Sequence, residues 1–149
     1  MIAIISILIM AITPNVTSPF LEEVRWQNRL FVRCDGQVTD IERKSDALRA
    51  DFADRDIAEI YLADGFVMEA LTPETASMPN AFANMRSLNE PNQAAIKALA
   101  QCDAEHRFAL IGKDGLLKKR WKTQPSADKL FAIIDAMPMR QEEMRSNSR

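Results

Sequence analysis

RFALIGKDGLLKKRWKTQPSADKLFAIIDAMPMRQEEM, residues 107–144, decides the fold, because it predicts a hairpin, a helix and a distinctive tail. Phe108 to Ile111 is a short apolar run that ends at Gly112-Lys113-Asp114-Gly115. The Asp114-Gly115 pair tolerates the positive φ angles of a tight turn. The chain is therefore expected to reverse here and return as a second strand over residues 116–122.

The returning strand alternates in character along its length. Because side chains alternate across a strand, Leu117 and Trp121 should point to a buried face, and Lys118, Arg120 and Lys122 to solvent. Cations on an edge strand discourage pairing with a second molecule. The sequence therefore predicts an edge strand at this position.

The same strand belongs to a basic cluster with a local charge of five minus one, or +4. Its members are Lys113, Lys118, Lys119, Arg120 and Lys122, against Asp114. Such a cluster could bind a polyanion through Lys118, Arg120 and Lys122. A solvated edge face is the simpler interpretation, because no aromatic residues interleave with these cations as they do in binders of single-stranded nucleic acid.

A helix should follow the hairpin. Pro125-Ser126 breaks the strand and offers an N-cap, and Asp128 places an anion in the first turn. Apolar residues then recur at helical spacing and should dock on the sheet: Leu130, Phe131, Ile133, Ile134 and Met137. Pro138 is expected to end this helix.

These segments resemble the family known as domain of unknown function 4174. The resemblance rests on IGKDG (111–115), the basic strand, LFAIIDAMPMRQEEM (130–144), LFV (30–32) and RDIAEIYL (55–62). It implies a thioredoxin-like fold, and members occur in bacterial envelope proteins and in secreted animal proteins with sushi repeats. No activity comes with it. The signature residues are Gly112, Lys113, Asp114, Gly115, Arg120, Asp135, Met137, Pro138, Met139 and Arg140.

The first half of the chain predicts a strand, helix and strand. Leu30, Val32 and Cys34 should share one face of the first strand. Thr39 to Glu42 has capping-box spacing and should open a helix that ends near Asp54, before a strand over residues 57–63. Arg33 is awkward in a strand covered on both faces, and it either reaches the sheet edge or pairs with an acid.

The fold class expected is α/β and thioredoxin-like, with a central mixed sheet of about four strands, flanking helices and a C-terminal hairpin plus helix. Residues 64–95 form a loop-rich insertion, rich in Pro, Thr, Ser, Asn and Met between residues 72 and 91, although Asp64-Gly65 could begin an extra hairpin. A helix over residues 92–101 should lead into the strand at Phe108.

Length and composition predict a single domain over residues 19–145, followed by a disordered tail at 146–149. The run MIAIISILIMAI is too short to span a bilayer and is typical of a signal-peptide core, so residues 1–18 are expected to be a signal peptide. An uncleaved anchor or a mis-assigned start are the alternatives. A net charge of −2 and a pI near 5.5 do not favour nucleic acid as a partner.

The two cysteines lack the Cys-x-x-Cys spacing of thiol–disulfide oxidoreductases. In a thioredoxin-like sheet the third strand runs antiparallel to the first, which would make Cys34 and Cys102 neighbours. Three alternatives stay open: separate buried thiols, a structural disulfide, or a reactive Cys34 assisted by Cys102 or His106. Too few soft ligands exist for a zinc site, so no metal or other cofactor is expected.

No complete catalytic constellation is present. Asp56, Glu59 and Glu69 are expected to be solvent-facing charges, and four glycines cannot build a nucleotide-binding loop. The leading hypothesis is therefore a periplasmic or secreted, non-redox binding or accessory module of the cell envelope, whose partner is an envelope protein or ligand. The alternative is an atypical thiol-dependent oxidoreductase or peroxidase that uses Cys34.

Overall fold

The computed structural model describes residues 16–41, 44–69 and 85–149. The part of the proposed signal peptide before residue 16 and the middle of the 64–95 segment lie outside these ranges. Within them, no helix is both long and apolar enough to cross a membrane. The elements, in chain order, are α1 (Pro19–Val24), β1 (Arg29–Arg33), a 3-10 turn (Val38–Asp40), α2 (Asp46–Asp54), β2 (Ile57–Tyr61), β3 (Phe66–Met68), β4 (Met85–Ser87), α3 (Glu90–Ala100), β5 (Phe108–Ile111), β6 (Leu117–Trp121), α4 (Ala127–Asp135) and α5 (Pro138–Asn147).

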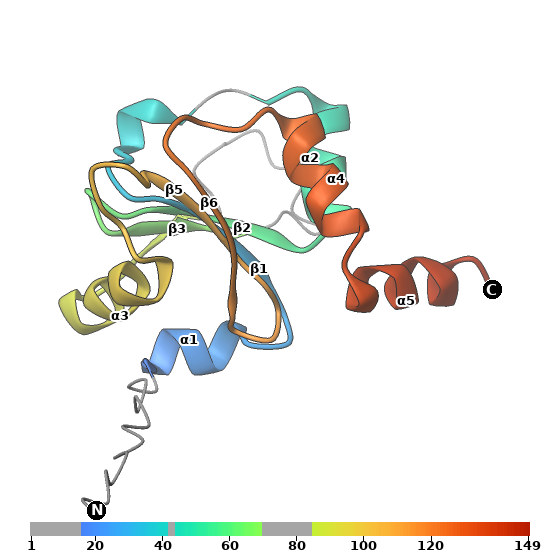
Figure 1. The fold of residues 1–149 in the computed structure, drawn as a ribbon, viewed down its shortest axis with the longest axis horizontal. Helices are drawn as coiled ribbons and strands as arrows, with labels where there is room; N and C mark the ends of the chain where they lie inside the picture. Colours follow the sequence, from blue (N-terminus) through green and yellow to red (C-terminus); the bar gives the residue numbers. More distant parts are fainter. Residues whose placement is uncertain (1–15, 42–43, 70–84) are drawn as a thin grey trace, which may run out of the picture.

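The strands form one mixed sheet in the order β4-β3-β2-β1-β5-β6 (Figure 1). β1 lies between β2, which is parallel to it, and β5, which is antiparallel. Leu30 stands opposite Ile111 and Arg33 opposite Phe108, which confirms the predicted neighbours. The sheet has six strands and not the predicted four, because β3 and β4 extend it beyond β2.

The extra hairpin begins at Gly65, which has a φ of +67°. This left-handed backbone conformation is accessible to glycine without strain. β3 then pairs antiparallel with β2, so the predicted additional strand after Asp64-Gly65 is confirmed. β3, β4 and the start of α3 all fall within the segment 64–95.

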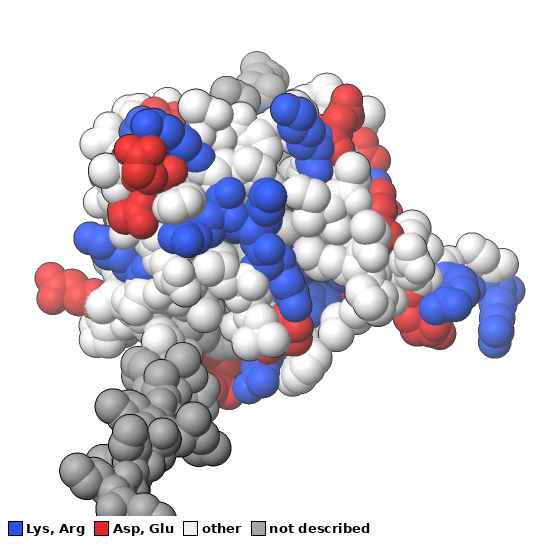
Figure 2. Space-filling view, in the orientation of Figure 1, with Lys and Arg blue, Asp and Glu red and all other residues white. Residues whose placement is uncertain are grey.

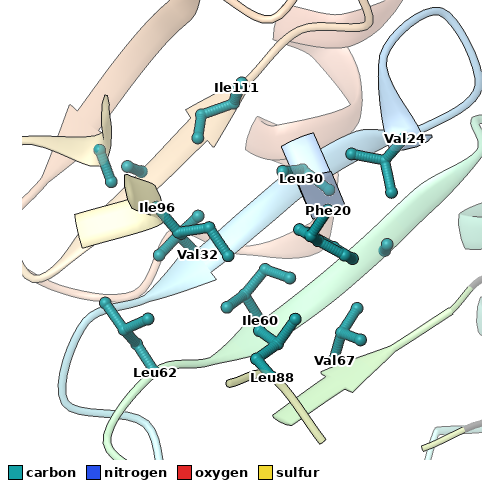
Figure 3. Packing of buried hydrophobic residues seen from close by; sticks show 13 residues of the cluster. Phe20, Val24, Leu30, Val32, Ile60, Leu62, Val67, Leu88, Ile96 and Ile111 are labelled. Carbon is teal, nitrogen blue, oxygen red and sulfur yellow. The ribbon is translucent and has the colours of Figure 1, made fainter. Parts of the chain in front are cut away.

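Helices cover both faces of the sheet. α1 and α3 pack on one face, where Leu30, Val32 and Ile60 meet Phe20 of α1 and Ile96 of α3 (Figure 3). Cys34 packs against the same cluster, as its alternation with Leu30 and Val32 predicts. The opposite face forms a second core, in which sheet residues meet α2 and α4: Phe31, Ile57, Leu110, Phe52, Leu130, Phe131 and Ile134.

The predicted facing of β6 is wrong. Leu117 packs on the α1 and α3 core, whereas Trp121 packs on the α2 and α4 core. The cause is a register shift, because Leu110 pairs with Lys119 but the next residue, Ile111, pairs with Leu117. A bulge of one extra residue inverts the alternation on one side of it, so Lys118 does not continue the face that Arg120 and Lys122 share.

Two helix boundaries also differ from the prediction. The backbone N–H of Gln37 donates to the Asp40 carboxylate and closes a short 3-10 turn, whereas α2 begins later with Ser45 as its N-cap. Pro138 ends α4 as predicted but also opens α5, because proline suits the first position of a helix, where its missing N–H costs nothing. α5 continues to Asn147, into the segment predicted as a disordered tail.

Candidate functional site

The candidate functional residues lie at the carboxyl end of β1. Cys34 follows the strand and Cys102 follows α3, and the structure joins the two in a disulfide with a Cα–Cα distance of 5.8 Å. Both residues are half-buried against the α1 and α3 core. This bond ties the end of the central strand to the end of a helix 68 residues away in the sequence.

His106 lies beside this disulfide but does not direct its ring at the sulfur. The His106 carbonyl oxygen lies 3.7 Å from Cys34 Sγ. Its ring Nδ1 is 3.0 Å from the Asp103 carboxylate and 3.2 Å from Arg120 Nη1. The structure thus brings Cys34, Cys102 and His106 together, but the imidazole is engaged by Asp103 and Arg120.

Arg33 is a buried cation at the same end of β1. Only 6% of the residue is exposed. Its Nη2 donates to Glu59 on β2 at 3.2 Å, and its Nη1 donates to Gln124 at 2.7 Å. Of the two alternatives for Arg33, the structure therefore selects pairing with an acid.

Glu59 is a buried residue, so its expected exposure is wrong. Lys44 Nζ binds its second carboxylate oxygen at 2.7 Å. The Arg33 guanidinium also lies 5.1 Å from the Phe31 ring centroid and 5.4 Å from that of Tyr61. Two cations and one carboxylate under α2 leave a local charge of +1. A buried charge is costly unless it is paired, which makes this cluster unusual for a structural core.

Two cavities of about 350 Å³ each open at this corner. The first is lined by Arg33, Gln124, Phe108 and Arg107. The second is lined by the disulfide together with Gln93 and Lys97 of α3. Asp35 borders both cavities.

The size and position of these cavities fit a small ligand. In open α/β sheets, ligands bind beyond the carboxyl ends of the strands, where the chain leaves toward opposite faces. Pockets for small molecules start at roughly 300 Å³. Within the described ranges, no group of three or more His, Cys, Asp or Glu side chains is arranged to hold a metal ion.

The basic cluster of the hairpin is locally neutralised. Lys and Arg side chains gather over β6 on the face shown in Figure 2. Three of them have acidic neighbours: Lys118 binds Asp114 at 2.5 Å, Arg120 lies 3.6 Å from Asp103, and Lys122 binds Glu105 at 2.9 Å. These pairings reduce the positive field that a polyanion would meet.

Most of the signature residues lie in the hairpin turn or in an ion-pair cluster. Gly112 to Gly115 form the turn, in which the Gly115 N–H donates to the Gly112 carbonyl. Met137 is the N-cap of α5 and packs against the α2 and α4 core, whereas Met139 is 39% exposed.

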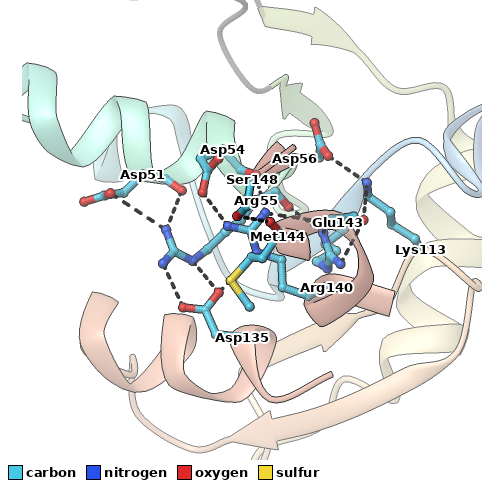
Figure 4. Close-up of polar contacts among 11 residues, drawn as sticks. Asp51, Asp54, Arg55, Asp56, Lys113, Asp135, Arg140, Glu143, Met144 and Ser148 are labelled. Carbon is cyan, nitrogen blue, oxygen red and sulfur yellow. Dashed lines mark hydrogen bonds and ion pairs between the residues drawn. The ribbon is translucent and has the colours of Figure 1, made fainter. Parts of the chain in front are cut away.

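Lys113, Asp135 and Arg140 converge in the ion-pair cluster although they lie on three different elements (Figure 4). Arg140 is 3% exposed and binds the carboxylates of Asp54 and Asp135, and also the Asp54 carbonyl at 2.9 Å. Asp135 also receives two hydrogen bonds from Arg55, at 3.0 and 2.8 Å. The Arg55 hydrogen bond, with a smaller contribution from Arg140, holds the pKa of Asp135 below its ordinary value.

Glu143 of α5 occupies the other half of this cluster. It receives hydrogen bonds from Arg29 at 3.2 and 3.3 Å and lies 2.8 Å from Lys113 Nζ. Partial burial alone would raise the pKa of Glu143, but the hydrogen bonds from Lys113 and Arg29 outweigh it and lower the pKa below its ordinary value. The carboxylate is therefore ionised at neutral pH.

A family described as "Domain of unknown function (DUF4174)" matches residues 20–143. The chain belongs to the DUF4174 family. The matched range runs from α1 to Glu143 and so includes both cavities, the disulfide and the ion-pair cluster. No curated protein and no solved structure gives a significant match to the chain.

Sequence reasoning missed Arg29, Lys44 and Arg55 as members of these sites and misplaced Glu59. One signal was available, because arginines stand at both ends of the apolar run LFV in β1. Two cations that bracket a central strand require acids from elsewhere in the fold. Which acids supply them depends on the tertiary arrangement and is not encoded in local spacing.

Proposed function

We propose that this DUF4174 protein is a thioredoxin-like, non-redox binding module that is exported to the periplasm or secreted, and that it takes a small ligand in the Arg33 cavity. The order β2-β1-β5-β6, with α2 and α4 on one face and α3 on the other, supports a thioredoxin-like arrangement. In this proposal β3 and β4 are an addition at the β2 edge. The absence of a Cys-x-x-Cys pair in the sequence favours binding over disulfide chemistry.

The observation that carries the proposal is the burial of Arg33 in a cavity wall. A cation on the central strand of a sheet covered on both faces is costly to bury, and its burial requires Glu59 and Gln124 as partners. A buried cation whose guanidinium borders a cavity is positioned to recognise an acceptor group of a ligand. The ligand expected is a small molecule with an acceptor group for the guanidinium and an apolar part that contacts Phe108.

The apolar run at the N-terminus and the long-range disulfide support export. Disulfides persist in oxidising compartments and are rare in the cytosol. The test is mass spectrometry of the unreduced protein from fractionated cells that express the full chain. We expect a mature N-terminus near residue 18 and one disulfide, whereas an uncleaved cytosolic chain with two free thiols would refute export.

Ligand binding is tested by a fragment screen monitored by amide NMR. Fragments should perturb the amides of Arg33, Gly36 and Phe108, and Arg33→Gln should abolish these shifts. Lys97→Gln, which alters only the second cavity, is the matched control and should leave them unchanged. Perturbations that persist in Arg33→Gln would refute the assignment of this cavity.

A second candidate function is thiol–disulfide exchange at Cys34. It is favoured by one observation, that the half-buried disulfide lines an open cavity beside Lys97. An adjacent cation would lower the pKa of a released thiol and make it more reactive. Alkylation of the reduced protein as a function of pH discriminates the two, because a Cys34 thiol that reacts well below pH 8 supports exchange and an ordinary thiol supports the binding module.

A further inference from the structure

Glu143 is held by three cations that come from three distant parts of the chain. Arg29 begins β1, Lys113 lies in the β5–β6 turn, and Arg140 lies one helical turn before Glu143 on α5. The Arg29 guanidinium embraces the carboxylate with both terminal nitrogens, Lys113 Nζ lies 2.8 Å away and Arg140 Nη1 lies 3.6 Å away. The side-chain exposures of these cations are 1%, 10% and 3%.

Arg29, Lys113 and Arg140 together form a cradle around the carboxylate. They differ in how far each depends on Glu143 as its counter-ion. Lys113 has a second acid in Asp56, and Arg140 has Asp54 and Asp135. Arg29 has only Glu143 within ion-pair range in the described part of the chain, apart from a hydrogen bond to the Arg55 carbonyl. Without that carboxylate, a fully buried guanidinium would keep its charge with no counter-ion, which is strongly unfavourable.

The helix that delivers the carboxylate is held mainly by charge. Arg140 is the only buried residue of α5, and the helix leaves the body of the protein beyond α4 (Figure 1). Its attachment runs through the ion pairs of Arg140 and Glu143, as Figure 4 shows. Little apolar surface would be exposed if α5 moved away, so the carboxylate acts as a tethered ligand more than as part of the core.

We propose that Arg29, Lys113 and Arg140 form a carboxylate-binding site that Glu143 occupies in cis. The cradle recognises a carboxylate by bidentate contact with a guanidinium and by the charge of two further cations. The tether gives Glu143 a high local concentration, which keeps an external carboxylate out of the intact protein. Once Glu143 is removed, a free carboxylate should bind in its place.

The test is chemical rescue of Glu143→Ala by acetate, with sodium chloride at equal ionic strength as the comparison. Acetate at about ten times its dissociation constant should raise the Tm of this variant by about 3–6 °C. The unsubstituted protein should show no acetate-specific rise, because its site is already filled. Glu142→Ala is the matched control, because Glu142 is 69% exposed and pairs only with Arg145 in the described residues.

Glu143→Gln is a second variant that fills the same space without charge. It should be destabilised and should not respond to acetate, because the amide blocks the cradle. If Glu143→Ala folds only when acetate is present, the proposal is supported. An equal response to acetate and chloride, a response shared by Glu142→Ala, or a failure of acetate to restore folding would overturn it.

Discussion

Removal of the Cys34–Cys102 disulfide should cost a large share of the stability of the domain. The bond joins positions separated by 68 residues, and the chain-entropy model assigns about 4 kcal/mol to a loop of this length. For a chain of this size, that loss lowers the Tm by about 10 °C. We expect this change on addition of dithiothreitol, followed by circular dichroism during heating.

The double substitution Cys34→Ala with Cys102→Ala supplies the control. Its Tm should match that of the reduced protein and should not respond to dithiothreitol. Alanine suits both positions, because the cysteines pack against an apolar core. If both thiols can be titrated and the reduced protein still melts at the same temperature as the oxidised one, the reasoning is refuted, because the bond would then not reduce the conformational entropy of the unfolded chain.

Three further predictions follow from individual contacts. Arg55 lowers the pKa of Asp135 from its ordinary value of 3.8, so the ionised carboxylate stabilises the fold fully above that value and loses this contribution as the pH falls through the lowered pKa. The difference in free energy of unfolding between the unsubstituted protein and Asp135→Asn, measured by urea titration, should therefore narrow below about pH 4. Gly36→Ala would place a Cβ 2.5 Å from the Cβ of Arg33, and the free energy of unfolding measured in urea should fall by about 1–3 kcal/mol. Trp121→Ala should cost about 2 kcal/mol in the same assay, whereas the exposed neighbour Lys119→Ala should be close to neutral.

The sequence predicts the centre of this fold well, because its signals there are local and redundant. The turn at Gly112 to Gly115 follows from glycine and aspartate in adjacent positions, and α4 follows from a proline, a serine cap and an apolar stripe. The pairing of β1 with β5 has a different source, because it was implied by the thioredoxin-like topology that the family resemblance suggests. The turn and α4 are each supported by more than one independent pattern in the sequence.

The elements that were mispredicted depend on contacts distant in the sequence. The bulge in β6 adds one residue, and LLKKRW carries no glycine to mark it, so strict alternation put Leu117 and Trp121 on one face. α5 has little apolar character, and its helix is stabilised by ion pairs whose partners are up to 114 residues away. Local spacing holds no record of such distant partners, so the long-range ion pairs of this cluster could not be predicted.

The two buried arginines of β1 make different polar contacts at the two ends of the strand. Arg29 and Arg33 point to the same face as Phe31, because side chains alternate along a strand, and four residues of strand separate them by about 13 Å. Arg29 contacts α5 through its ion pair with Glu143. Arg33 pairs with Glu59, which also binds Lys44, and it donates a hydrogen bond to Gln124 in the segment before α4. Since burial of either cation is costly without its partners, both ends of the central strand are specified by polar contacts and its middle by apolar packing. Arg33 borders an open cavity, whereas Arg29 is covered by the tethered carboxylate of Glu143. A buried arginine therefore forms part of an accessible site at one end of β1 and of an occupied site at the other.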